Sequence, residues 1–158
     1  MKIGPRKVRI LVLAAGLALF CPTLPTVGDE RENVDRIKLN IDAIEYAKKL
    51  IAKGEVVVDG RGAWVHHQPS SEEENEFIRQ HGFEEYAKWH LGIDEGRPEA
   101  TKARYKFPCG DFKNVHRCAV LAVKSRAAQY NYDEIEHAAS DLLQMIEMQQ
   151  GSGATPLP

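Results

Sequence analysis

Apolar residues recur every three or four positions in three separate segments of this 158-residue chain. This spacing places the apolar side chains on one face of an α-helix, so each segment predicts an amphipathic helix. The first is expected over about residues 33–53 and ends at Gly54, a favoured residue after a helix C-terminus. The second is expected over residues 112–129 with Asp111 as its N-cap, and the third over residues 134–148.

Shorter helices are expected in the middle of the chain. Ser70 with Glu73, or Ser71 with Glu74, forms a capping box at the start of one of them. A second short helix is expected over residues 83–90.

Extended segments join these helices. The β-branched run Val56-Val57-Val58 has no evident partner strand, so we interpret it as an extended connector. Residues 105–108 are also expected to be extended, because the residue before a proline avoids the α region. The pattern predicts a mainly α protein, a small single-domain helical bundle with long irregular connections over residues 29–150, followed by a disordered tail over residues 151–158.

Residues 1–28 have the layout of a secretory signal peptide. Four basic residues precede an uncharged apolar run over residues 10–20, and a polar segment begins at Asp29. We expect cleavage after Gly28, which removes four basic residues and no acidic one and changes the formal net charge from −2 to −6. The protein is therefore expected to be exported, periplasmic or envelope-associated, or membrane-anchored if the signal is not cleaved.

Sequence signatures of catalysis are absent. The chain has no GxSxG motif, no glycine-rich phosphate loop and no paired-carboxylate signature. We therefore do not expect an enzyme, and no cofactor is expected. An exported acidic protein is also not expected to bind nucleic acid.

Three stretches carry a family resemblance: HQPSSEEENEFIRQHGF, EEYAKWHLGID and TKARYKFPCGDFKNVHRCAVLAVKSRAAQYNYDEIEHAA. Over residues 59–147 the chain resembles an uncharacterised family of small bacterial proteins that share the segment KARYKFPxGDFxxVHRxAxxAxxSRAxQ. Cys109 stands where the family pattern has an aromatic residue. The resemblance implies no particular activity, cofactor or catalytic residue.

The cysteines and histidines raise a metal hypothesis. Cys109, His116 and Cys118 form the best local set of zinc-type ligands, although the chain has no CxxC or HExxH motif. If residues 112–129 form one helix, His116 and Cys118 point in different directions, which weakens the set. Cys109 and Cys118 either form a disulfide, as export favours, or remain thiols.

One segment is strongly basic in this acidic protein. Between residues 102 and 126 seven basic residues face a single acid, Asp111, and aromatic residues lie among them. This pattern predicts an anion-binding or partner-binding site, and the alternative is pairing with the acidic clusters at residues 72–76 and 84–85. The candidate residues are Lys102, Arg104, Tyr105, Lys106, Lys113 and Arg117.

Together these features favour a non-catalytic exported accessory or binding protein, a subunit of an envelope or membrane-associated complex. Its expected partners are an acidic protein surface or anionic membrane headgroups. The alternative functions are a zinc-type metal-binding protein and, with less support, a small enzyme of unknown class.

Overall fold

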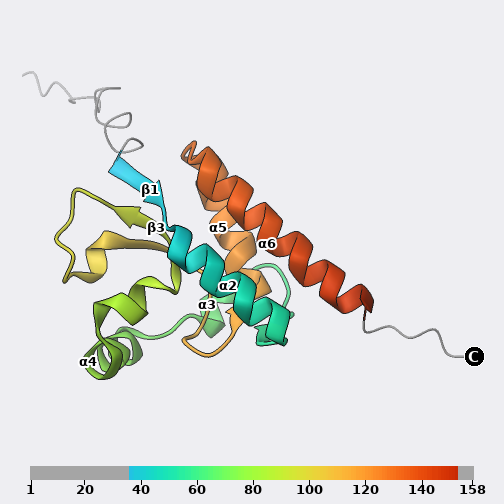
Figure 1. Cartoon of the computed structure of the whole chain (residues 1–158), viewed down its shortest axis with the longest axis horizontal. Helices are drawn as coiled ribbons and strands as arrows, with labels where there is room; N and C mark the ends of the chain where they lie inside the picture. Colours follow the sequence, from blue (N-terminus) through green and yellow to red (C-terminus); the bar gives the residue numbers. More distant parts are fainter. Residues whose placement is uncertain (1–35, 153–158) are drawn as a thin grey trace, which may run out of the picture.

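A computed structural model of the chain describes residues 36–152, and within them it contains both helices and two small β-sheets (Figure 1). The prediction of a mainly α helical bundle is therefore wrong, and the described part is mixed α/β. The expected signal peptide over residues 1–28 lies outside the described residues. The final helix continues through Ser152, beyond the expected start of the tail at residue 151, and the rest of that tail also lies outside the described residues.

The first expected helix is divided into a strand and a helix. Strand β1 covers Ile37–Leu39, and helix α2 covers Ile41–Lys53. The division occurs at Asn40, whose side-chain oxygen accepts a hydrogen bond from the backbone of Ala43 as an N-cap. The Asn40 amide also donates to two backbone carbonyls near the start of β3, which fixes the strand before the helix begins. Gly54 ends α2 in the left-handed conformation, as expected.

The larger sheet is antiparallel and has the strand order β1-β3-β4. Strand β3 covers His90–Asp94, and β4 covers Tyr105–Pro108 after a short 3₁₀ turn, Lys102–Arg104. The expected helix over residues 83–90 is not separate, because helix α4, Ser71–Ala87, continues through a kink at Gly82 with φ of 80°. The capping box Ser70–Glu73 is confirmed at its start.

A second, two-stranded sheet overturns the interpretation of residues 56–58 as a connector. Strand β2, Val56–Val57, pairs in parallel with β5, Val115–His116. Because β5 takes these residues, helix α5 begins later than expected and covers Arg117–Gln129. Asp111 does not cap this helix; its Oδ1 accepts from the backbone amides of Lys113 and Asn114 and closes a turn before β5.

The core lies where the long helix α6, Asp133–Ser152, packs against both α5 and α2 (Figure 1). The three-stranded sheet and α4 lie on the other side of α2 in this view. The largest fully buried apolar side chains belong to Ile51, Tyr86, Leu91, Val115, Val120, Ile135, Leu142 and Ile146. Within residues 36–152, none of the helices combines the length and apolar character needed to cross a membrane.

Aromatic residues join the sheet to the helices in more than one group. Tyr86 packs edge-on against Tyr105, and Trp89 packs edge-on against Tyr46 of α2. Trp89 is 3% exposed, and a Cβ at Gly110 would collide with its ring and with the Asn114 carbonyl. Glycine at position 110 therefore allows the turn before β5 to lie directly on the core.

Candidate metal centre

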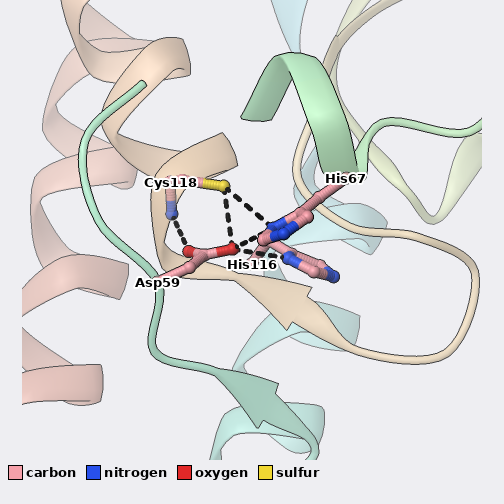
Figure 2. A group of neighbouring side chains, drawn as sticks. All are labelled: Asp59, His67, His116 and Cys118. Atoms are coloured by element: carbon pink, nitrogen blue, oxygen red, sulfur yellow. Dashed lines mark hydrogen bonds and ion pairs between the residues drawn. The ribbon is translucent and has the colours of Figure 1, made fainter. Parts of the chain in front are cut away.

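The parallel pairing of β2 with β5 brings together residues that are almost sixty positions apart. Val57 is opposite His116 in the register, so the chains leave the sheet at the same edge. Asp59 follows β2 by two residues, and Cys118 follows His116 by two residues. The side chains of Asp59 and Cys118 consequently meet just beyond the sheet (Figure 2).

The Asp59 carboxylate caps helix α5, although the two lie far apart in the sequence. The N-cap residue of this helix, His116, makes no side-chain capping bond. Instead, Oδ1 of Asp59 accepts a hydrogen bond of 2.6 Å from the backbone amide of Cys118, in the first turn. A carboxylate is favourable there because the first helical amides lack partners and the helix dipole is positive at this end.

The second carboxylate oxygen lies between three further polar groups. Oδ2 of Asp59 accepts from the thiol of Cys118 at 2.9 Å. Nδ1 of His116 lies 2.7 Å from Oδ2, and Nδ1 of His67 lies 2.6 Å from it. One ligand atom from each of the four residues can be chosen so that all lie within 4.8 Å of one another. We call these four residues, Asp59, His67, His116 and Cys118, the ligand cluster.

His67 reaches the ligand cluster from the short helix α3, Trp64–His67. The chain turns back between β2 and α3 through Gly62, whose φ of 87° suits a residue without a Cβ. Trp64 then packs on the ring of His116 with centroids 5.9 Å apart, and the rings of His67 and His116 are 5.0 Å apart. His67 is the most accessible member, with 37% of its side chain exposed, while the side chains of Asp59 and His116 are 8% and 6% exposed.

The protonation states follow from these contacts. Burial opposes ionisation of Asp59, but hydrogen bonds from Cys118 and both histidines outweigh it and hold the pKa of this carboxyl well below its usual range. Burial raises the pKa of Cys118 to about 12, and the hydrogen bond to the negative Asp59 adds to the rise. Cys118 is therefore a thiol at neutral pH, which argues against a role as a catalytic nucleophile.

A second carboxylate lies behind His116. Nε2 of His116 is buried and lies 3.3 Å from Oδ2 of Asp111, on the side of the ring that points away from Asp59 (Figure 2). When Nδ1 of a histidine binds a metal, its Nε2 carries the hydrogen and commonly faces a carboxylate. Asp111 thus occupies the place of such a partner.

The sequence identified two of the four residues in the ligand cluster. His116 and Cys118 are members, because His116 belongs to strand β5 and not to the helix, so the helical argument against the pair does not apply. Cys109 is not a member; its thiol donates to the backbone carbonyl of Trp89 at 3.4 Å. Both cysteines are free thiols, so the disulfide alternative is wrong.

Asp59 and His67 were not singled out as ligands from the sequence. The signal that could have found Asp59 is the Val-Val run before it, read as a strand paired with the short segment before α5, whereas no sequence signal points to His67.

Most of the predicted anion-binding residues have partners inside the chain. Lys102 pairs with Glu74 of α4 at 2.9 Å, which is the internal pairing considered as the alternative. Two other basic residues and the tyrosine also have internal contacts: Arg104 with Glu99, Arg117 with Glu147, and the Tyr105 hydroxyl with the Glu99 carbonyl.

Lys106 and Lys113 differ from the other candidate residues of the anion-binding prediction. Within residues 36–152 neither makes an ion pair. An external anionic partner for the segment therefore stays a prediction, and among its candidate residues these two lysines have no ion pair inside the described part of the chain.

No protein-family model, curated protein or solved structure shows significant similarity to this chain. The resemblance to an uncharacterised bacterial family therefore stays a prediction, and the candidate function depends on the geometry described above.

Proposed function

We propose that this protein binds one zinc-type divalent ion through Asp59, His67, His116 and Cys118. The observation that carries the proposal is the convergence of two imidazoles, a thiol and a carboxylate from three separate segments within 4.8 Å (Figure 2). Thiolate, imidazole and carboxylate are the ligands that zinc uses in proteins, whereas magnesium and calcium prefer oxygen ligands alone. The proposal takes up the metal-binding alternative; the exported accessory role stays a proposal about location and partners.

The spacing of the ligand atoms suits a tetrahedral ion after a small adjustment. With Zn–N of about 2.0–2.1 Å and Zn–S of about 2.3 Å, the edges of the tetrahedron are about 3.3–3.6 Å. Sγ of Cys118 and Nδ1 of His67 are 3.9 Å apart, which is close to such an edge. Oδ2 of Asp59 lies nearer to both imidazoles than this, so it must withdraw by roughly 0.7 Å to admit the ion.

A bound metal ion would also balance the negative charges of the ligand cluster. A bound cation would replace the thiol proton of Cys118 and be held by the negative charges of the thiolate and of Asp59. Four protein ligands leave no open coordination position, which is typical of structural zinc sites. We therefore propose a non-catalytic role, in which the ion fastens α3 and the segment after β2 to the start of α5.

The proposal predicts one zinc ion per chain in protein purified without a histidine tag, stripped with a chelator and dialysed against zinc. His67→Ala should lower the zinc content at limiting zinc, and because His67 is partly exposed, the fold should survive. His66→Ala is the matched control, since its neighbour His66 is exposed and outside the ligand cluster. Elemental analysis after dialysis measures both. Equal zinc content in the two variants, or none in the unaltered protein, would show that the ligand cluster is only a hydrogen-bonded support for α5.

A further inference from the structure

A cavity of about 540 Å³ is lined in part by Trp64, which also contacts His116 of the ligand cluster. Residues of α3, β4, α5 and the turn before α6 line it. Four of the residues that line it are aromatic: Trp64, Phe107, Tyr130 and Tyr132. A cavity of this volume, with apolar walls and a few polar groups, is typical of a site for a small organic molecule.

An irregularity in β4 shapes one wall. Phe107 has φ of 61°, a left-handed conformation that is unusual for a residue with a large side chain. It interrupts the alternation of the strand, so the successive residues Lys106, Phe107 and Pro108 all border the cavity. The Phe107 ring packs edge-on against Tyr132 with centroids 5.6 Å apart, and its Cδ2 would lie only 2.8 Å from a Cβ on Gly92, so the wall is fixed by the core. Such backbone outliers occur often at binding sites.

Two cations border the same cavity, and the residues that line it include no acid. Lys106 is half-buried and makes no ion pair within the part of the chain that the structure describes. Arg126 lies over the ring of Tyr130, 5.3 Å from its centroid, and is likewise paired with no carboxylate of the described residues. Asp94, whose charge acts on the nearby Tyr132, is already paired with Arg36 at 2.8 Å. The cavity therefore offers uncompensated positive charge beside apolar walls.

We propose that this cavity binds a small organic carboxylate, whose apolar body lies among the aromatic rings and whose carboxylate lies between Lys106 and Arg126. Aromatic walls can hold either an aryl or an alkyl body. Whichever body is bound, the two cations favour a ligand with a single carboxylate attached to it. The site is separate from the ligand cluster and does not depend on a bound metal. It gives a use to Lys106 and Arg126, two residues of the basic segment that make no ion pair within the described residues.

Calorimetric titration of the whole protein with 2-naphthoate, decanoate and the neutral 2-naphthalenemethanol tests the proposal. Saturable binding of either acid, at least about tenfold tighter than the alcohol, is expected because a contact to a charged group is worth more than a neutral one. The acid that binds more tightly identifies the body as aryl or alkyl. Equal affinity for 2-naphthoate and the alcohol, or saturation by none of the three compounds, would overturn the proposal.

Substitutions in the cavity test whether the acid binds there. Lys106→Met and Arg126→Met should each weaken binding of the preferred acid by about tenfold, whereas Lys113→Met, which changes an exposed lysine outside the cavity, should not. Unaltered thermal melting of the variants shows that each remains folded. As a second measurement, the acid should change tryptophan emission in the unaltered protein but not in Trp64→Phe, which keeps only the core residue Trp89. Binding that is unchanged in all three cavity variants contradicts the assignment.

Discussion

Replacing Cys118 with alanine is expected to weaken zinc binding by roughly 100-fold or more. Zinc bound to structural sites contributes about 10–16 kcal/mol, so one of four ligands accounts for about 2.5–4 kcal/mol, and each 1.4 kcal/mol is a factor of ten. Cys109→Ala is the matched control, because Cys109 is equally buried but its thiol faces the Trp89 carbonyl. Competition against a chromophoric chelator gives the two affinities. If both variants keep the affinity of the unaltered protein, the thiol is not a ligand.

The zinc affinity is also expected to depend on pH. In the metal-free protein the pKa of Cys118 is about 12, so the residue is a thiol throughout the neutral range. Zinc must displace that proton, and affinity should rise about tenfold for each pH unit between about pH 7 and 9. Cys118→Ala should lose this slope. A slope that persists in the variant would assign the released proton to another group.

Replacing Asp59 with alanine is expected to destabilise the protein even without metal, by about 2–4 kcal/mol. The change removes the side-chain cap that Asp59 provides for α5. It leaves the Cys118 amide without its partner and takes the Asp59 contact from both histidines, and each buried unsatisfied group costs about 1–3 kcal/mol. A domain of this size should then melt roughly 5–15 °C lower in the presence of a chelator. Asp141→Ala, at an exposed position of α6, is the control and should stay within about 0.5 kcal/mol.

Acidification should reduce this difference. The pKa of Asp59 in the folded protein is below its ordinary value of 3.8, so its contribution to stability is fully present above that value and declines as the pH falls through the folded pKa. The gap between the unaltered protein and Asp59→Ala should therefore be constant from neutral pH down to about pH 5 and become smaller below pH 4. A gap that disappears already near pH 6 would point to the histidines rather than to the carboxylate.

The helices could be predicted where the signals are local. Gly54 marks the end of α2 as a C-cap residue, and the Ser70–Glu73 capping box marks the start of α4. Most of α6 follows from apolar residues that recur every three or four positions. Asn40 could also have been recognised as an N-cap, but the apolar stripe continues across it, because Ile37 contributes to the core from a strand rather than from the helix.

The ligand cluster could be predicted only in part, because its assembly is not local. Strands β2 and β5 have two residues each and lie far apart in the sequence, so neither produces a periodic pattern. Without their pairing, nothing connects Asp59 to Cys118. Treating residues 112–129 as one helix then separated His116 from Cys118, although the strand-to-helix junction at Arg117 brings both side chains to Asp59.

For the basic segment, the sequence shows the charges but not their partners. Its composition was evident, but whether each cation is paired depends on tertiary contacts such as Lys102 with Glu74 and Arg117 with Glu147. Lys106 has the same charge as these residues, and only its position beside an aromatic cavity distinguishes it.

X-ray absorption at the zinc edge of the reconstituted protein tests the metal-binding proposal most directly. The ligand cluster predicts a four-coordinate ion with one sulfur at about 2.3 Å and three nitrogen or oxygen neighbours at about 2.0–2.1 Å. Cys118→Ala should lose the sulfur contribution, and Cys109→Ala should keep it. A first shell of oxygen and nitrogen alone, or a six-coordinate ion, would contradict the assignment of zinc to Asp59, His67, His116 and Cys118.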